Sequence, residues 1–221
     1  MSLRWKAAAK RILRSGLPVP LVIRPVIHLL YRLGVFVVEV FLFLRKFLWA
    51  EPVLRSICEN VGKGLRAERL PYIRGRGRLS IGDRVNLSGR SSFYFMGGMP
   101  ERPEIRVGSD TFIGNGCTFS AARLILIGDH CLIAALVRIH DNDGHSLDPV
   151  KRRAGHPIGL ADSAPVVLEE NVWIGAGATI LKGVRIGRDS VVGSGAVVTS
   201  DVPQGTVVAG NPAMPVKRLK T

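Results

Sequence analysis

Residues 167–203 read VLEENVWIGAGATILKGVRIGRDSVVGSGAVVTSDVP, and this stretch repeats every six residues. Each repeat has an aliphatic residue and, four places later, a small or β-branched one. The aliphatic positions are Ile174, Ile180, Ile186, Val192 and Val198, followed by Ala178, Val184, Ser190, Ala196 and Val202. An α-helix has a period of about 3.6 residues and a strand a period of about two, so neither fits. A fixed hexad with glycine-rich turns predicts a parallel β-helix.

The hexad sets the geometry of the coil. An aliphatic residue at every sixth position can point inward only if the chain turns once per hexad, so three hexads close one triangular coil of about eighteen residues. The residue four places later lies near a crowded corner and must be small. Glycine directly after the aliphatic residue, as at Gly175, Gly187 and Gly193, predicts a corner with positive φ. Stacked coils bury one continuous aliphatic column, so stability needs several of them.

The same phase continues upstream in a less regular form. It holds at Ile81 and Val107, and two extra residues after Phe119 predict a bulge or loop. The frame returns at Ile139 and is then lost over residues 140–167, a polar stretch with three prolines and no repeat of its own. Loops of this length inside a compact domain are usually functional or disordered. We therefore expect this insertion to carry the chemistry.

Two segments of the chain resemble a known family. The run from Val172 to Pro203 and the closing segment Ala209-Gly210-Asn211-Pro212-Ala213 are similar to the hexapeptide-repeat acyltransferases, and most to their sugar O-acetyltransferase branch. The resemblance covers roughly the C-terminal two-thirds of the chain. It implies a left-handed β-helix, a homotrimer with active sites between subunits, and acetyl-CoA as co-substrate, with no metal. The handedness comes from the resemblance, because six-residue spacing does not fix it.

Charge distinguishes two parts of the chain. Residues 1–78 contain 16 Lys or Arg and 4 acidic residues, whereas residues 79–221 contain 15 and 13. Most of the net charge of +14 therefore belongs to the N-terminal part. We predict a helical appendage over residues 1–78 and a mainly β catalytic domain over residues 79–203, with an inserted loop at 140–167. Residues 204–221 are predicted to form a C-terminal tail.

The N-terminal appendage is also the most apolar part of the chain. Residues 1–14 alternate apolar and basic side chains, as amphipathic helices at membrane surfaces do. Residues 26–49 are strongly apolar and predict a helix with one narrow polar stripe, made of His28, Arg32, Glu39 and Lys46. The longest charge-free stretch is residues 33–38, far short of the roughly 20 mainly apolar residues of a spanning helix. We expect residues 1–50 to associate with the membrane surface, with the apolar segment lying in the interface or re-entering it but not crossing.

The appendage has other interpretations. The apolar helix can instead cover the open end of the β-helix or pack in the trimer. Nucleic acid is a poor partner, because the basic residues are interleaved with aliphatic runs and form no solvated stripe. Arg24 interrupts the stretch that would form a signal peptide, and no small-residue cleavage site follows. We therefore expect a cytoplasmic protein, peripheral on the inner face of the cell membrane, where acetyl-CoA is found.

The three cysteines predict no disulfide and no metal pair. Cys117 and Cys131 occupy the small inward positions of their hexads, and Cys58 is alone in the appendage. The sequence has no CxxC pair. We interpret all three as buried thiols.

The insertion begins with HDNDGHSLDP at residues 140–149, two histidines among acidic residues. Acetyl transfer from a thioester to an alcohol needs a base for the hydroxyl proton, and imidazole suits this near neutral pH. His145 matches the family's catalytic histidine, so the resemblance implies that it is the general base, and His140 is the alternative. Asn142 and Asp143 are candidates to line the acceptor pocket, and any of the three aspartates can orient the imidazole. Turn formation is the simpler explanation of the Asn and Asp residues.

The resemblance also implies a donor groove between subunits. The positions that would line it are Trp173, Gly175, Ala176, Ser194 and Thr199, and Lys217 or Arg218 would meet the nucleotide phosphates. Many relatives have a basic residue after the threonine, whereas this chain has Ser200. Other basic residues on exposed corners are candidate substitutes: Lys182, Arg185 and Arg188.

The predicted function is therefore acetyl-CoA-dependent O-acetylation of a sugar hydroxyl, within polysaccharide biosynthesis. A protein at the membrane surface would meet a saccharide or a lipid-linked glycan as acceptor. One alternative is a zinc-dependent γ-type carbonic anhydrase, in which His140 and His145 would need a third histidine, His130 or His156. Another is a non-catalytic trimeric scaffold. The donor-groove run and the Gly210-Asn211-Pro212 ending favour acetyl transfer.

Overall fold

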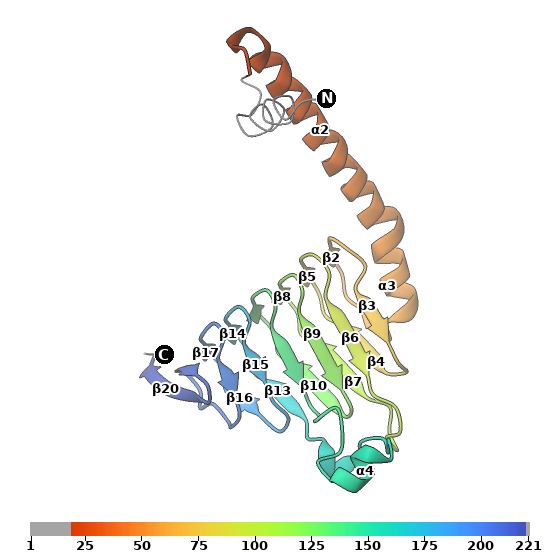
Figure 1. The fold of residues 1–221 in the computed structure, drawn as a ribbon, viewed down its shortest axis with the longest axis vertical. Helices are drawn as coiled ribbons and strands as arrows, with labels where there is room; N and C mark the ends of the chain where they lie inside the picture. Colours follow the sequence, from red (N-terminus) through yellow and green to blue (C-terminus); the bar gives the residue numbers. More distant parts are fainter. Residues whose placement is uncertain (1–18, 220–221) are drawn as a thin grey trace, which may run out of the picture. The chain divides into compact units, whose positions relative to one another are not determined.

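The computed structural model describes residues 19–219. The chain divides into two compact units, residues 1–43 and residues 44–221 (Figure 1). The amphipathic helix predicted over residues 1–14 lies outside the described residues.

The described part of the first unit is helical, and the helix runs on into the second. A 3-10 turn, η1 (Leu21–Ile23), leads into α2 (Arg24–Arg45), which continues through a π-helical turn, η2 (Lys46–Ala50), into α3 (Glu51–Ile57). Pro25 lies in the first turn of α2, where its missing N–H removes no helical hydrogen bond. Every residue of α2 is exposed. Residues 21–57 form a helix that is long and apolar enough to cross a membrane, judged by length and composition alone.

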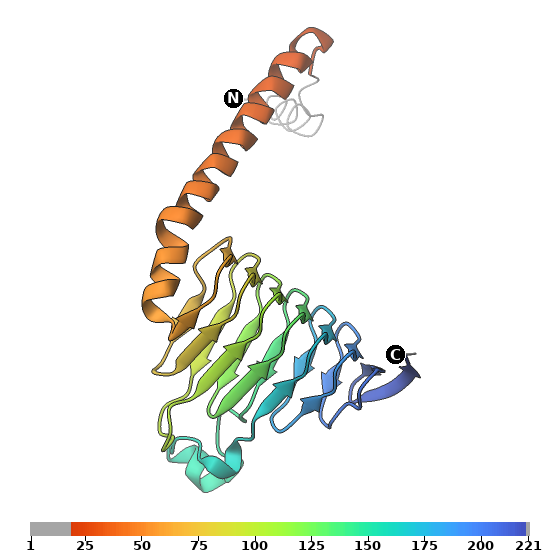
Figure 2. The same ribbon diagram turned by 180° about the vertical axis from the view of Figure 1, so that it is seen from behind.

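The second unit is a parallel β-helix, as the hexads predict. Sheet A contains β1 (Asn60–Val61), β4 (Arg78–Ile81), β7 (Glu104–Val107), β10 (Leu124–Ile127), β13 (Val166–Leu168) and β16 (Arg185–Ile186). Sheet B contains β2 (Arg66–Ala67), β5 (Asn86–Leu87), β8 (Phe112–Ile113), β11 (Leu132–Ile133), β14 (Trp173–Ile174), β17 (Val191–Val192), β19 (Thr206–Gly210) and β20 (Ala213–Arg218). Sheet C contains β3 (Tyr72–Arg74), β6 (Ser92–Phe95), β9 (Thr118–Ala121), β12 (Arg138–His140), β15 (Thr179–Ile180) and β18 (Val197–Val198). Each coil visits A, B and C in turn, and the coils stack along the unit (Figure 2).

Columns of inward side chains fill the interior. The column of sheet B is Ala67, Leu87, Ile113, Ile133, Ile174, Val192 and Val208, all buried and in register. Sheet C adds Phe93 and Phe119, whose rings stack 5.0 Å apart between centroids. Burial of each large aliphatic side chain stabilises the fold by roughly 1.5–3 kcal/mol. The predicted inward hexad positions are confirmed.

The thiols of Cys117 and Cys131 are buried in this core, as predicted. Burial raises the pKa of each thiol to about 11. Cys58 is also buried, and the pKa of its thiol is raised to about 11 for the same reason. All three thiols are therefore protonated at neutral pH.

The β-helix begins earlier than the predicted boundary at residue 79. Its first coil already runs through β1, β2 and β3, which pair in parallel with β4, β5 and β6. The sequence holds a signal for this coil, because Val61, Ala67, Ile73 and Leu79 are six residues apart. The signal is weak because Ala67 is small and arginines surround it. The helical appendage therefore ends at Ile57, with α3.

The predicted bulge after Phe119 is absent. Strands β9 and β10 have four residues each, and each points two side chains inward: Phe119 and Ala121, then Ile125 and Ile127. Phe119 and Ile125 are six residues apart, and the two extra residues are taken up within β10, where Ile125 and Ile127 are both buried.

The glycines after the aliphatic residues serve close packing of coils rather than positive φ. Gly175, Gly187 and Gly193 are not among the residues with positive φ. A Cβ added to Gly175 would lie 2.5 Å from the backbone N of Ser194 in the next coil. Positive φ occurs instead at corner residues such as Gly177 and Gly195. The prediction of positive φ at the first set of glycines is therefore wrong.

The C-terminal tail is ordered and ends the β-helix. Strand β19 adds to sheet B in parallel with β17, and β20 turns back to pair with β19 in antiparallel fashion. Residues 206–218, predicted as part of a tail, thus extend sheet B past the last full coil.

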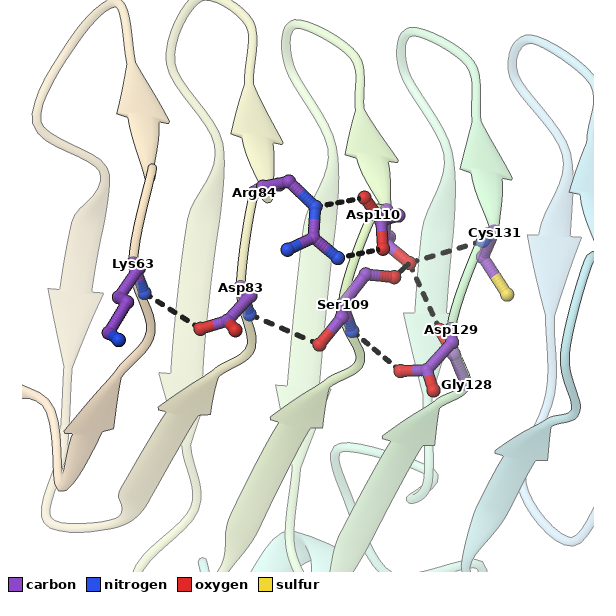
Figure 3. A network of polar contacts seen from close by, with 9 residues as sticks. Lys63, Asp83, Arg84, Ser109, Asp110, Gly128, Asp129 and Cys131 are labelled. Carbon is purple, nitrogen blue, oxygen red and sulfur yellow. Dashed lines mark hydrogen bonds and ion pairs between the residues drawn. The ribbon is translucent and has the colours of Figure 1, made fainter.

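Polar side chains at the A-to-B corner tie successive coils together (Figure 3). The backbone N–H of Lys63 donates to Asp83 Oδ1 (2.7 Å), that of Asp83 to Ser109 Oγ (3.2 Å), and that of Ser109 to Asp129 Oδ1 (2.6 Å). These acceptors satisfy corner N–H groups that have no partner in the sheets.

Glu104 should make stability depend on pH. Its largely buried carboxylate accepts hydrogen bonds from Arg106 and Arg78, which together hold the pKa of Glu104 below its usual range, with Arg106 the larger cause. A carboxylate whose folded pKa is lowered stabilises the fold above its unfolded pKa, about 4.3, and loses this contribution as the pH falls through the folded value. Glu104→Gln should cost about 1 kcal/mol at neutral pH, since both arginines are partly exposed, and nothing in strong acid. Thermal unfolding followed from neutral pH to about pH 3 checks this, and parallel curves for the two proteins would contradict it.

Candidate active site

The insertion projects from the corner between sheets C and A. It begins after β12, contains α4 (Pro149–Arg153) and η3 (Leu160–Asp162), and returns to the coil at β13 (Figure 1). A cavity of about 390 Å³ lies where the insertion meets the connection between β6 and β7. Its lining is Arg78, Met99, Pro100, Glu101, Arg102, Glu104, Ala122, Arg123, Leu124, Leu160 and Pro165. The histidines of the insertion do not line this cavity.

Asp141 fastens the start of the insertion to the previous coil. Its side chain is fully buried, and its carboxylate accepts the backbone N–H groups of Ala122 (2.6 Å) and Arg123 (2.7 Å). Its carbonyl oxygen accepts the N–H of Ala164 (2.8 Å), at the far end of the insertion. Both ends of the insertion are thus held by one residue.

Asn142 continues this anchor. Its buried amide donates to the carbonyl oxygen of Ser120 (2.9 Å) and to Asp141 Oδ1 (3.0 Å), and its Oδ1 accepts the N–H of Gly144 (3.0 Å). The side chain is therefore occupied inside the protein. Asn142 thus positions the loop, and its expected place at the acceptor pocket stays a prediction.

His145 lies on the exposed turn that follows. The next residue, Ser146, is buried, and its Oγ accepts the N–H of Asp148 (3.2 Å). Arg152 donates to the carbonyl oxygens of Ser146 and Leu147, both at 3.0 Å. Within residues 19–219, the His145 imidazole has no hydrogen-bond or ion-pair partner. The exposed imidazole therefore lies on a turn that is held by hydrogen bonds of Asn142 before it and Ser146 after it.

His140 is held differently. It is the last residue of β12 and stands in register with Ser120 of β9. The imidazole is half-buried, and burial lowers its pKa, helped by the nearby charge of Arg138 and opposed by Asp141. A lowered pKa keeps His140 neutral at physiological pH. Its position in the strand leaves it less access to a ligand than His145 has.

The two remaining aspartates of the loop have structural partners. Asp143 forms an ion pair with Lys182 of a later coil, and its backbone N–H donates to the carbonyl oxygen of Asp162 (3.1 Å). Asp148 caps α4 by accepting the N–H groups of Val150 and Lys151, and these bonds lower its pKa. Asp143 is the aspartate nearest in sequence to His145, two residues before it.

Most of the predicted donor residues lie on sheet B or at the corner that follows it. The outward column of this sheet runs from Phe112 through Leu132, Trp173, Val191 and Val207 to Lys217. Trp173 is 52% exposed and Leu132 49%, so the middle of the column is an open apolar strip. Ala176 and Ser194 are exposed at the corner beside it, between sheets B and C, where the N–H of Gly195 donates to the carbonyl oxygen of Ala176 (2.8 Å).

The structure separates two groups of predicted site residues. Gly175 is buried where coils touch and can contribute only backbone, and Arg218 is exposed beside Lys217 on β20. Thr199, however, follows β18 and lies at the C-to-A corner, which is the corner of the histidine loop. The apolar strip around Leu132 and Trp173 on sheet B, which we call the donor strip after its predicted role, therefore lies away from the corner of the histidine loop. Of the substitute phosphate contacts, Lys182 and Arg185 already pair with Asp143 and Glu169.

The described residues give little support to the alternative of a zinc site. His130 lies at the A-to-B corner, whereas His140 lies at the C-to-A corner. Among the residues the structure describes, no three His, Cys, Asp or Glu side chains are grouped so that they could hold a metal ion.

Comparison with protein families identifies the repeat. The model described as bacterial transferase hexapeptide (six repeats) matches residues 165–200. The resemblance found in the sequence is therefore confirmed for this segment: residues 165–200 carry the hexapeptide repeat of bacterial transferases.

Named relatives and solved structures agree with this. A putative acetyltransferase of Schizosaccharomyces pombe is 37% identical over 52% of this chain and 54% of its own length. A galactoside O-acetyltransferase of Lactococcus lactis is 43% identical over 42% of each chain. A hexapeptide-repeat acetyltransferase of Vibrio cholerae, solved in complex with acetyl coenzyme A, is 29% identical with a TM-score of 0.55, over 77% of this chain and 76% of its own. This chain spans about half the length of the curated relatives it matches.

Proposed function

We propose that this hexapeptide-repeat protein is an acetyl-CoA-dependent O-acetyltransferase with a sugar hydroxyl as acceptor and His145 as general base. The observation that carries the proposal is the exposed His145 imidazole on a turn fastened by buried Asn142 and Ser146. A base must be placed before the reaction and remain free to take a proton. The solved relative with bound acetyl coenzyme A supports the choice of donor.

The proposed reaction needs one proton transfer in each direction. His145 takes the proton of the acceptor hydroxyl while its oxygen attacks the thioester carbonyl carbon. The C–O bond forms, the C–S bond breaks, and the imidazolium returns the proton to the leaving thiolate of CoA. Asp143, two residues before His145, is held by its ion pair with Lys182 and so helps to fix the turn.

The similarity to a galactoside O-acetyltransferase supports a sugar as acceptor. The test is an assay of the full chain with acetyl-CoA and a panel of galactosides and lipid-linked glycans, in which released CoA thiol is measured. We expect thiol release that depends on a glycan acceptor. Thiol release without acceptor dependence, or none with any member of the panel, would refute the proposed transfer.

We further propose a left-handed coil and a homotrimer, in which the donor strip of one subunit faces the histidine loop of another. Support comes from the separation of these two groups within one β-helix. The exposed apolar column of sheet B is also a surface that a neighbouring subunit can cover.

Leu132→Asp should therefore convert trimer to monomer. A charge in the middle of the apolar column cannot be buried against another subunit without loss of several kcal/mol, on the order of the values for unpaired buried charges. Sedimentation measures the mass, and Leu136→Asp, at an exposed corner outside the column, is the control. An unchanged mass for Leu132→Asp would place the subunit contact elsewhere.

The membrane role of the N-terminal segment is a separate proposal. Every residue of α2 is exposed, including Phe36, Phe41 and Phe43 at 61–63%, and the helix is strongly apolar. Such a surface is stabilised by lipid, so we propose that residues 1–50 hold the protein on the membrane surface. On the cytoplasmic side it would meet both acetyl-CoA and lipid-linked glycan precursors of polysaccharides.

A further inference from the structure

A second cavity lies at the first coil of the β-helix, far along the sequence from the histidine loop. It has a volume of about 420 Å³. Its lining, which we call the basal pocket, is Arg45, Trp49, Ile57, Arg69, Leu70, Pro71, Tyr72, Ile73 and Arg90. All of these residues belong to the second unit.

All of the charged residues that line the basal pocket are basic. Three of its residues are arginines, and none is acidic. In the part of the chain that the structure describes, no carboxylate forms an ion pair with Arg45, Arg69 or Arg90. The cavity beside the insertion differs, because its three arginines are accompanied by two glutamates. The basal pocket therefore lacks a counter-ion.

One of the three arginines lies over an aromatic ring of the pocket. The Arg90 guanidinium lies over the Tyr72 ring, 5.9 Å from its centroid, and Tyr72 packs edge-on against Tyr94 at 5.8 Å. A stacked guanidinium keeps its N–H groups free to bind in its own plane. Arginine forks bind phosphate through paired, charge-assisted hydrogen bonds. The site therefore has the chemistry of a phosphate receptor.

The position of the basal pocket in the chain indicates the source of the phosphate. Arg45 is the last residue of apolar α2, and Trp49 is 59% exposed one helical turn later. Trp and Tyr concentrate at the headgroup level of membranes, and basic residues next to apolar helices attract anionic lipid. Ile57, Leu70 and Ile73 add an apolar side that suits the glycerol or acyl part of a lipid.

We propose that the basal pocket binds the phosphate of an anionic lipid headgroup through Arg45, Arg69 and Arg90. The identification of lipid as the source rests on the proposed membrane role. The pocket would turn loose association of the helix into docking with a fixed depth and orientation. That orientation would present the β-helix, and the glycan site on it, to the membrane in one way.

The test measures binding of the full chain to vesicles of phosphatidylcholine with and without phosphatidylglycerol. Arg69→Gln/Arg90→Gln should weaken binding to the anionic vesicles by about 25-fold, about fivefold for each arginine. Binding to pure phosphatidylcholine should not change. The matched control is Lys63→Gln/Arg76→Gln, which removes two exposed charges of the same coil outside the pocket. An equal loss in the control would show diffuse surface charge and overturn the proposal.

A second arm separates the lipid from the phosphate. With Trp5 and Trp173 changed to Phe, Trp49 is the sole tryptophan and reports on the pocket. Glycerol phosphate without vesicles should shift its fluorescence weakly and saturably, and not in Arg69→Gln/Arg90→Gln. No response to glycerol phosphate would refute the phosphate site even if vesicles bind. A response in a protein that binds no vesicle would refute the membrane role and the lipid as source.

Discussion

His145→Ala should lower kcat by about two to four orders of magnitude, the range that a general base contributes. The imidazole is exposed on the turn between Asn142 and Ser146, and no described residue would be left without a partner by its removal. Stability should therefore change little. The Kd for acetyl-CoA should also stay the same, because the donor strip lies on sheet B and does not include the turn.

Steady-state thiol release and calorimetric titration with acetyl-CoA measure the two quantities. His156→Ala is the matched control, since His156 is exposed in the same insertion and its backbone N–H, not its side chain, bonds to Lys151. It should retain full turnover. Added imidazole should restore part of the activity of His145→Ala, because the vacated turn is open to solvent.

Full activity in His145→Ala would transfer the role to His140. Burial keeps the pKa of His140 low, so that its imidazole is neutral and can accept a proton. Truncation of His140 would also leave a gap against β9, so a loss of stability should accompany its effect. The two histidines can therefore be told apart by the pair of measurements.

The hexad alone predicted most of the fold. Six-residue spacing gave the inward columns, the three-sheet coil and the position of the insertion, because each depends on local spacing. The first coil was missed although Val61, Ala67 and Ile73 keep the spacing. A small alanine contributes little to an aliphatic pattern, whereas its pairing with Leu87 in the next coil is plain in the structure.

The contacts of the site could be predicted only in part. The sequence shows which histidines and aspartates the insertion contains, but it does not show which residues they contact. Asp141 accepts N–H groups of Ala122 and Arg123, 19 and 18 residues earlier, and Asp143 pairs with Lys182, 39 residues later. Such pairs depend on how many residues each coil takes up. The internal partners of Asn142 could not be predicted for the same reason, since burial by a neighbouring coil leaves no mark on spacing.

Asp141→Ala should destabilise the protein and disable the site together. The change removes a fully buried carboxylate that accepts two backbone N–H groups. Each N–H group left without an acceptor costs about 1–3 kcal/mol. We therefore expect a loss of about 2–6 kcal/mol in the free energy of unfolding, smaller if water enters. The insertion also loses the hydrogen bonds that hold its start to the previous coil. A shift of about 1 Å in a catalytic group can lower the rate about a hundredfold.

A matched variant separates the loss of stability from the loss of catalytic rate. Asp83→Ala removes another carboxylate that accepts a backbone N–H, that of Lys63, at the A-to-B corner away from the insertion. It should lower stability without a change in kcat, and it is more exposed, so the loss should be smaller than for Asp141→Ala. Chemical denaturation and kcat are measured at a temperature where both variants are folded. If Asp141→Ala then kept the kcat of the unmodified protein, the turn of His145 would not need its anchor, because Asp143 and Lys182 would hold it in place on their own.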